Sequence, residues 1–196
     1  MKLKTALIIC AGLVFIGCSS KEAPKPQTSP QVSGECVIQD TEAPKWVCTG
    51  GDIKDYITAV GSAKPTPLGF SFQRSEAMAI ARDEIAKQLQ TKVKNMFKNY
   101  MATTGAKIDS VEKVTEYVSK QLTKQTLTGS KQLNIWIAPD KTLFVLVGVP
   151  LNATKVKEVI KSSLKNQEAL WQKFQSQKAQ KELDESIDKE FGNQYY

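Results

Sequence analysis

Histidine is absent from this 196-residue chain. It is the side chain that most often acts as a general base near neutral pH, and it is the commonest metal ligand. Its absence excludes Ser-His-Asp and Cys-His catalytic arrangements. The glycine-rich run "TGGD" at residues 49–52 lacks the lysine of a phosphate-binding loop, and there is no CxxC motif. We therefore expect no enzymatic activity, no cofactor and no bound metal.

Arginine is also scarce, because the 27 basic residues include only Arg74 and Arg82. The formal net charge of +7 comes from lysines that are spread along the chain. Segments that bind nucleic acids usually concentrate basic residues on one face or in one stripe. We interpret the charge as a contribution to solubility and to affinity for an acidic envelope surface, and we expect no nucleic-acid partner.

The longest uncharged segment lies at the N-terminus. Residues 5–17, "TALIICAGLVFIG", follow Lys2 and Lys4. The segment is shorter than the roughly 20 apolar residues of a membrane-spanning helix, and it has the features of a secretory signal peptide. Its end, where Gly17 precedes Cys18, resembles the bacterial lipoprotein signal. This resemblance implies that residues 1–17 are removed and that Cys18 receives a diacylglycerol on its sulfur and an acyl chain, such as palmitate, on its amino group.

A polar segment follows the expected lipid site. Residues 18–34 contain Pro24, Pro26 and Pro30 and few apolar side chains. Such a composition cannot build a core and predicts an extended, flexible tether. Each buried methylene of the acyl chains would contribute about 0.8 kcal/mol, so release from the membrane would be negligible. Ser19 after Cys18 resembles the pattern of lipoproteins sent to the outer membrane, on its periplasmic or its surface face.

Cysteine is rare, and the four cysteines fall into two groups. Cys10 would leave with the signal peptide, and Cys18 would carry lipid. Cys36 and Cys48 remain as a pair in an oxidising compartment, which predicts a disulfide between them. A metal site or a reactive thiol is the competing interpretation, and the absence of histidine and of CxxC weakens it.

The next segment changes from strand to helix. Residues 55–64, "DYITAVGSAK", alternate and are rich in β-formers, so they predict a strand. Gly61 marks its end or the close approach of another backbone. From about 71 to 103 the apolar period becomes four, which predicts a long amphipathic helix that Gly105 ends. Its early alanines would let it lie close to a sheet. The expected buried stripe is Ala77, Ala81, Ile85, Leu89, Val93 and Phe97.

A second helix and a hairpin come next. Asp109 and Glu112 fit a capping box, and the expected stripe of the second helix is Val111, Val114, Val118 and Leu122. Residues 131–137 alternate as a strand, "APDK" is a turn, and residues 142–149 are apolar at nearly every position, as in a central strand. The sequence predicts an α+β fold: a small three-stranded antiparallel sheet covered by a long amphipathic helix, with an added long C-terminal helix.

The sequence resembles a known family at four places. "APKWV" at 43–47, "AVGSA" at 59–63, "AMAIARDEIAKQLQTKV" at 77–93 and "LFVLVGV" at 143–149 are similar, in that order, to the Lpp-twenty outer-membrane lipoprotein family, to which the flagellar lipoprotein FlgP is related. The resemblance covers roughly residues 43–150. It implies a dodecin-like α+β fold, no known catalytic activity, and a role in envelope assembly around the flagellar motor, in adhesion or in surface antigenicity.

The C-terminal segment, from Asn152 almost to Phe191, reads as helical. Lysines crowd its start and acids crowd its end, and both clusters oppose the helix dipole. Two such helices lying antiparallel would place the lysines of one beside the acidic residues of the other. This arrangement points to a partner helix in a homo-oligomer. A frayed, solvated tail is the other interpretation.

Three further side chains leave alternatives open. Trp46 is expected to fill the core beside the disulfide rather than to stack on a ligand. Trp136 faces away from Ile135 and Ile137, and it packs either under a helix or in an oligomer surface. Arg82 is expected to pair with an acid such as Glu76, or to reach solvent, rather than to bind an anion.

These observations divide the chain into 1–17 (signal peptide), 18–34 (lipidated tether), 35–150 (α+β domain) and 151–196 (C-terminal helix). We expect a non-enzymatic outer-membrane lipoprotein that self-associates in an envelope assembly, with flagellar-motor or other envelope proteins as partners. The alternatives are a tethered binding module that activates a periplasmic enzyme, such as a peptidoglycan synthase, and a surface adhesin or antigen.

Overall fold

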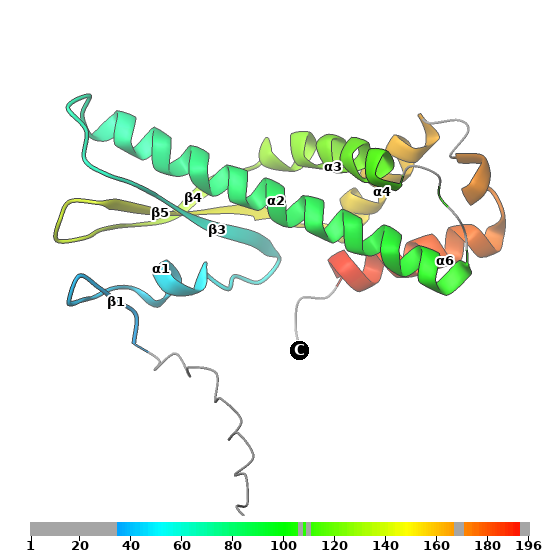
Figure 1. The fold of residues 1–196 in the computed structure, drawn as a ribbon, viewed down its shortest axis with the longest axis horizontal. Coiled ribbons are helices and arrows are strands. Elements are labelled where there is room, and N and C mark those ends of the chain that lie inside the picture. The colour runs from blue at the N-terminus through cyan, green and yellow to red at the C-terminus, as the bar shows by residue number, and fades with distance from the viewer. Residues whose placement is uncertain (1–34, 106–107, 109–110, 167–170, 193–196) are drawn as a thin grey trace, which may run out of the picture. The chain divides into compact units, whose positions relative to one another are not determined.

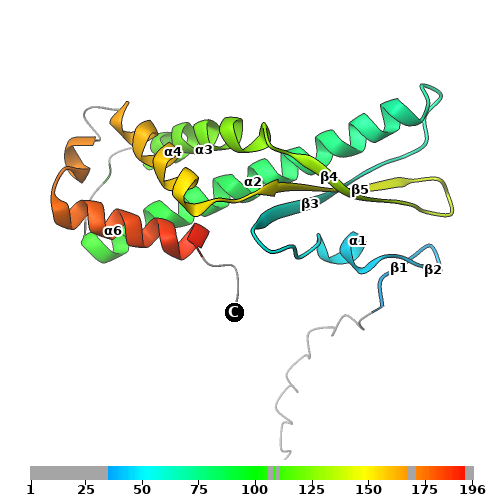
Figure 2. The same ribbon diagram turned by 180° about the vertical axis from the view of Figure 1, so that it is seen from behind.

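The computed structural model describes residues 35–105, 108, 111–166 and 171–192, and Figures 1 and 2 present the ribbon from two opposite sides. The main sheet has three antiparallel strands in the order β3-β5-β4, as predicted. They are β3 (Tyr56–Ala63), β4 (Lys131–Ile137) and β5 (Leu143–Pro150). Strand β5 is central, and Val145, Leu146 and Val147 are all buried. Its continuous apolar sequence follows from this double-sided burial.

Helix α2 (Phe70–Thr104) crosses one face of the sheet (Figure 1). Gly105 ends it in the left-handed conformation, with φ 67°, and donates its N–H to the Met101 carbonyl at 2.9 Å. The predicted long helix and its C-terminal glycine are therefore confirmed. All six residues of the predicted stripe are 0 % exposed: Ala77, Ala81, Ile85, Leu89, Val93 and Phe97.

The close contact between α2 and β3 depends on small residues. A β-carbon on Gly61 would lie 1.9 Å from the Ala77 carbonyl oxygen and 2.6 Å from the Ala81 amide nitrogen. Real β-carbons do not approach other atoms so closely, so this position requires glycine. Gly61 thus marks the close approach of another backbone, which was one of its two predicted roles.

Gln73 fastens the start of α2 to the sheet. Its side chain is buried, and its Nε2 donates to the Ala63 carbonyl at the end of β3 and to the Lys141 carbonyl in the β4–β5 turn, both at 2.9 Å. A buried amide must find partners, because an unsatisfied donor costs about 1–3 kcal/mol. Nothing in the helical stripe signalled this role.

Helix α3 (Val111–Leu127) follows, and its buried face differs from the predicted stripe. Val118 and Leu122 are buried, whereas Val111 and Val114 are only partly buried. Thr115 and Ser119 are buried on this face, and the Ser119 hydroxyl is satisfied because it donates to the Thr115 carbonyl. The predicted cap residue Asp109 lies outside the described residues.

The β4–β5 turn is built around Pro139, as predicted. Lys141 N–H donates to the Ala138 carbonyl at 2.8 Å, and Ala138 N–H donates to the Thr142 carbonyl at 2.9 Å. Lys141 itself has φ 65°. This is a type I turn followed by a left-handed residue, a common three-residue hairpin connection.

The C-terminal segment is not the single long helix that the sequence predicts. It forms α4 (Ala153–Lys165), a 3₁₀ turn (Gln172–Phe174), α6 (Gln177–Ile187) and a π-helical turn (Asp188–Gly192). The Ser176 hydroxyl caps α6 by accepting the Ala179 N–H at 3.1 Å. A new helix therefore begins within residues 175–181, "QSQKAQK", which contain few apolar side chains.

Helices α4 and α6 run antiparallel and are joined by ion pairs. Lys157 Nζ lies 2.6 Å from Asp188 Oδ2, and Lys161 Nζ lies 2.9 Å from Asp184 Oδ2. The lysine cluster and the acidic cluster thus meet within one chain. The antiparallel match was expected between two copies, and the structure forms it by folding the segment back.

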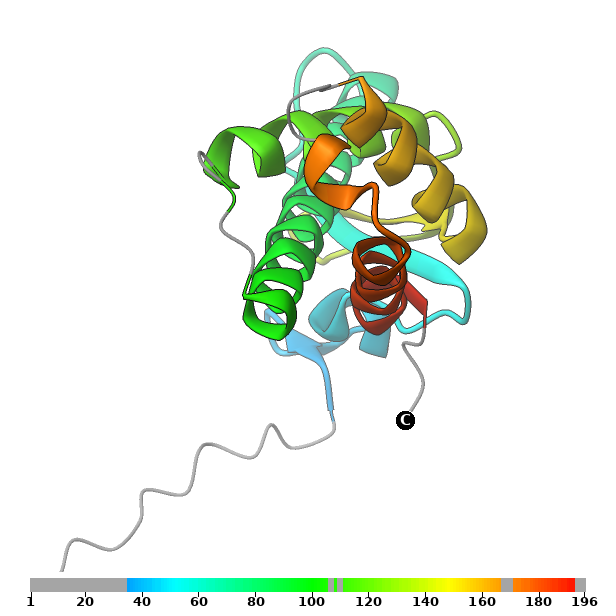
Figure 3. The same cartoon turned by 90° about the vertical axis from the view of Figure 1, so that its right-hand side faces the viewer.

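The folded-back segment covers the second half of α2 (Figure 3). The Tyr100 and Phe174 rings have centroids 5.0 Å apart. Asn99 Nδ2 donates to Glu190 Oε1, and Lys92 Nζ donates to the Glu190 carbonyl, both at 2.8 Å. The predicted apolar stripe of the segment is buried except at Trp171, which is partly buried. Its buried members are Val156, Ile160, Leu164, Phe174, Leu183, Ile187 and Phe191.

Candidate functional site

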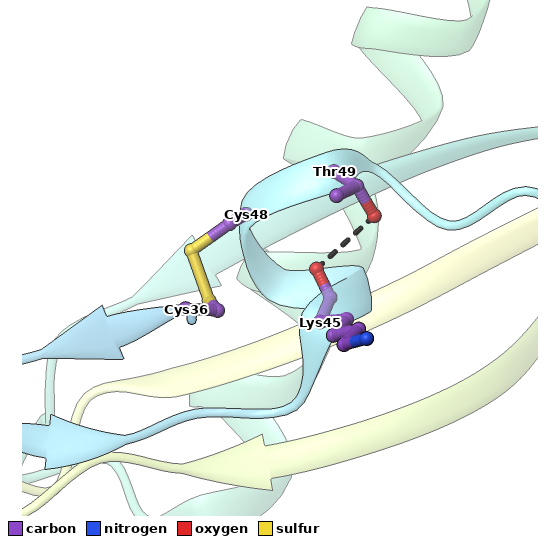
Figure 4. Close-up of a disulfide and its surroundings, with 4 residues drawn as sticks. All are labelled: Cys36, Lys45, Cys48 and Thr49. Atoms are coloured by element: carbon purple, nitrogen blue, oxygen red, sulfur yellow. Dashed lines mark hydrogen bonds between the residues drawn. A yellow bond between two sulfur atoms is a disulfide. The ribbon is translucent and has the colours of Figure 1, made fainter. Parts of the chain in front are cut away.

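The predicted lipid site, Cys18, and the predicted tether, residues 18–34, lie outside the described residues. The predicted disulfide is present, because Cys36 and Cys48 are joined with their Cα atoms 5.8 Å apart (Figure 4). The bond closes a small unit whose strands and helix had not been predicted from the sequence. Strands β1 (Val37–Ile38) and β2 (Thr41–Glu42) form a hairpin, and α1 (Lys45–Thr49) follows. We call residues 36–51 the stapled segment.

Local bonds organise the stapled segment. Ala43 N–H donates to the Cys36 carbonyl at 2.7 Å and closes the hairpin. The Thr49 hydroxyl donates to the Lys45 carbonyl at 3.0 Å (Figure 4). The hairpin turn, Gln39 and Asp40, has φ of 51° and 58°. These residues lack the glycine that usually marks such turns, so the hairpin gave no sequence signal.

The stapled segment packs on the sheet face opposite α2 (Figures 1 and 2). A β-carbon on Gly51 would lie 3.0 Å from the two methyl carbons of Leu146, so the backbone there touches β5. The Thr58 hydroxyl of β3 donates to the Gly51 carbonyl. Asp140 N–H in the β4–β5 turn donates to Gln39 Oε1 at 3.2 Å. The sheet is thus held between α2 and the stapled segment.

The two tryptophans near this face are half-buried. Trp46 in α1 is only partly covered, so the prediction that it fills the core is wrong. A helix of one turn has too little surface to bury an indole. Trp136 lies 5.5 Å from the Phe144 ring, measured between centroids, on the face opposite α2. It therefore packs beside a residue of the neighbouring strand β5.

The two flanks of α2 over the sheet carry opposite charges. Arg82 Nε donates to Ser130 Oγ at 2.9 Å, and Arg74 Nε donates to Gln132 Oε1 at 2.8 Å, so both arginines face the β4 side. Gln88 Nε2 donates to the Thr58 carbonyl at 3.1 Å, and Glu84 lies beside it, so the other flank faces β3. The predicted partner of Arg82 was an acid, and the observed one is a serine hydroxyl.

Two cavities lie at the end of the sheet. One, of about 610 Å³, lies between α3 and α4 and includes Gln125, Lys155 and Glu158 in its walls. Another, of about 660 Å³, lies beside the start of α4 and the π-helical turn, with Tyr56, Asn152 and Phe191 in its walls.

Three groups have displaced pKa values. Hydrogen bonds from the Thr142 amide, the Gln39 side chain and the Thr142 hydroxyl lower the pKa of the exposed Asp140 carboxyl. Burial lowers the pKa of the Lys92 ammonium, and Glu190 partly offsets this. Burial raises the pKa of the Tyr100 phenol, which a hydrogen bond from Thr104 opposes.

In the part of the chain that the structure describes, no three His, Cys, Asp or Glu residues are grouped closely enough to hold a metal ion. No helix in the described ranges has both the length and the apolar character needed to cross a bilayer.

The fold and its disulfide define a small α+β domain with a covalently closed N-terminal segment. Residues 44–150 match the model of the LPP20 lipoprotein family. This match covers more than half of the 196-residue chain, and the protein belongs to the LPP20 lipoprotein family. The match runs from the start of α1 to the end of β5, so it includes the sheet, α2 and α3. No curated protein matches the chain.

Proposed function

We propose that the protein is a lipid-anchored outer-membrane lipoprotein that has no catalytic role and self-associates in an envelope assembly. The most specific version of this proposal is a flagellum-associated role in motility. The observation that carries the proposal is the family match over residues 44–150, in a chain whose Gly17–Cys18 pair resembles a lipidation signal.

The disulfide supports an envelope location. Disulfides persist in secreted and periplasmic proteins and are rare in the cytosol. Cys36 lies close to the end of the proposed tether, and Cys48 closes the segment that packs on the sheet. A chain pulled through its tether would therefore load a covalently closed unit.

A non-catalytic role agrees with the chemistry of the described surface. The described residues hold no cluster of His, Cys, Asp and Glu that could bind a catalytic metal ion. The whole chain lacks histidine. Binding and assembly are therefore the activities that we assign to it.

The test is swimming through soft agar by a strain that lacks this chain, complemented with the wild type or with Cys18→Ala. Under the proposal, motility is lost and only the lipidated form restores it. A Cys10→Ala variant is the matched control, because Cys10 lies in the proposed signal and should be dispensable. Normal motility in the deletion strain would remove the flagellar form of the proposal.

A tethered module that activates a periplasmic enzyme is the second candidate, and the cavity between α3 and α4 favours it. This cavity is lined by both apolar and polar side chains, including Leu122, Gln125 and Val159. Site-directed cross-linking from Gln125 in intact cells would distinguish the candidates. Capture of a peptidoglycan synthase by a monomer would support the module, and capture of further copies of this chain would support self-association.

A further inference from the structure

Both outer strands of the main sheet have an edge to which no described strand is hydrogen-bonded. Edge strands usually carry charges or prolines that block pairing with another chain. Strand β3, "YITAVGSA", carries neither over eight residues. On its outer side the Tyr56 N–H donates to the Ile53 carbonyl and the Thr58 carbonyl accepts from Gln88, so the template for a further strand is the stretch from Val60 to Ser62. On β4 a bulge lies between Gln132 and Asn134, and the Ile135 N–H donates to Asn134 Oδ1, so the open stretch is its end at Ile137.

The α2 flank above each edge exposes a distinct set of side chains. Residues that immediately precede the buried stripe lie about 100° around the helix from it, on the β3 flank where Glu84 and Gln88 are found. Phe72, Glu76 and Ile80 share this position, and Phe72 and Ile80 are 50 % and 45 % exposed. The β3 flank therefore carries apolar groups and the carboxylates of Glu76 and Glu84, and Glu84 also forms an exposed ion pair of 3.4 Å with Lys87 of the same helix.

The opposite flank is apolar and basic. Arg74 and Arg82, the only arginines of the chain, immediately follow stripe positions and reach the β4 side. Ile135 and Ile137 of β4 are 37 % and 53 % exposed on the same side of the sheet as α2. The two edges of the sheet thus carry opposite charges and similar apolar groups.

The strand register places these groups at matching heights. Ile137 and Ala63 both pair with Leu143, so they lie at the same height along the strands. Gln73 is hydrogen-bonded to Ala63, which places its neighbour Phe72 at this height too. Ile135 and Gly61 both pair with Val145 and share a second height. Ala81 lies against Gly61, which places its neighbour Ile80 at that height.

The charged groups match in the same way. Gln132, the partner of Arg74, is level with Ala59 through Val147. Glu84 lies beside Ala59 on the opposite flank. A copy displaced sideways without a shift along the strands would therefore bring apolar groups onto apolar groups and arginines onto glutamates.

We propose that the β4 edge of one copy pairs with the β3 edge of the next copy, with the arginine flank against the glutamate flank. The proposal rests on the proposed self-association and specifies its surface. Because β3 and β4 both run antiparallel to β5, they are parallel to each other, and the new ladder is parallel. Every α2 stays on the same side, and such a head-to-tail contact builds a ring or a filament.

The same pattern disfavours a two-fold contact. Pairing of two β3 edges would set Glu84 near its own copy, and pairing of two β4 edges would set arginines against arginines. Each copy adds three strands, or about 14 Å, whereas helices pack about 8–10 Å apart. The remaining gap between neighbouring α2 helices has room for large side chains, which Phe72, Ile80, Ile135 and Ile137 supply.

The first test reverses the charges in the full lipidated chain, purified in detergent, with the assembled mass measured by light scattering. Arg74→Glu and Glu84→Arg should each weaken assembly about tenfold or more. The double variant, or a mixture of the two single variants, should restore it. Lys98→Glu and Glu116→Arg change exposed charges elsewhere and are the matched controls.

A second test leaves the charges unchanged, because Arg74 also bonds to Gln132 and its loss could affect folding. The Ile80→Cys, Ile135→Cys double variant is treated in isolated envelopes with a short bismaleimide. A head-to-tail contact gives a ladder of dimers, trimers and larger species. Each single variant lacks one half of every contact and should give no ladder.

The outcomes separate the two proposals. A wild-type chain that is monomeric in detergent and in envelopes would overturn self-association, and the edge contact with it. A wild-type assembly that is insensitive to both reversals, together with the absence of a ladder, would overturn the edge contact and leave self-association standing. A cross-linked dimer, and nothing larger, from either single variant would indicate a two-fold contact instead.

Discussion

The backbone of Gly61 in β3 lies directly against the backbone of Ala77 in α2. A β-carbon on Gly61 would stand 1.9 Å from the Ala77 carbonyl oxygen. This contact brings the helix close enough for its stripe to be buried, and it sets the position of both α2 flanks over the sheet edges.

Gly61→Ala should therefore destabilise the domain by about 3 kcal/mol, because a backbone carbonyl cannot move aside as a side chain can. The measurement is urea unfolding followed by tryptophan fluorescence. Gly129→Ala is the matched control, because a β-carbon there would stand 3.7 Å from its nearest neighbour, the Thr126 carbonyl oxygen, and no left-handed φ is required. Equal stability of the two variants would contradict the close contact.

Removal of the disulfide should destabilise the chain through the stapled segment. Cys36→Ser with Cys48→Ser opens a closed loop with a separation of 12 residues. The free energy of unfolding should fall by about 3 kcal/mol, because the unfolded chain gains conformational freedom. Reductant should bring the wild type to the level of the variant and leave the variant unchanged. A wild type that resists reductant, with a variant of equal stability, would contradict this expectation.

The fold-back of the C-terminal segment predicts coupling between Lys161 and Asp184. Their side chains are 29 % and 34 % exposed, so a double-mutant cycle with Lys161→Met and Asp184→Asn should give about 0.5–1 kcal/mol. The pair Lys181–Glu185 is 79 % and 59 % exposed and serves as the weaker control. Salt at about 1 M should reduce both couplings. A coupling that appears only in the assembled protein would point to pairing between copies.

Asp140 predicts a specific loss of stability in acid. The pKa of its carboxyl is lowered in the folded chain, chiefly by the hydrogen bond from the Thr142 amide. The unfolded chain therefore takes up the proton at a higher pH than the folded chain does. The resulting stability is fully present above the unfolded value of about 3.9 and is lost as the pH falls through the lower folded value.

Asp140→Asn should flatten the dependence of stability on pH below about 4. The measurement is urea unfolding over this range, with the Asp140 carboxyl followed by NMR. Asp83→Asn replaces an exposed carboxylate on α2 and is the control. An Asp140 carboxyl that titrates at the ordinary value would contradict the role of these hydrogen bonds.

Local patterns were sufficient for much of the fold. These patterns are the period of four in α2, the glycine at its end and the apolar run of β5. Each can be read from the sequence because it involves residues that lie close together along the chain. Gly61 and the early alanines predicted the close helix–sheet contact. The disulfide followed from the number of cysteines and from the compartment. The family resemblance over roughly residues 43–150 is confirmed by the match over residues 44–150.

Other features depend on contacts that a linear pattern does not contain. The β1–β2 hairpin uses Gln39 and Asp40 at positive φ without glycine, and its hydrogen-bond partner Asp140 lies far along the chain. Likewise, the buried roles of Gln73, Thr115 and Ser119 depend on which carbonyls lie opposite them.

The sequence by itself determined an α+β domain with a central apolar strand, one long helix, a disulfide and a lipoprotein-like start, because each of these has a local composition or period. Only the tertiary structure decided where the charges of the C-terminal segment are matched. The lysines at its start and the acidic residues at its end can pair with each other only if two helical segments lie antiparallel. The second segment could come from a partner chain or from the same chain. The break before α6 lets the chain supply its own, since Lys157 and Asp188 then meet at 2.6 Å.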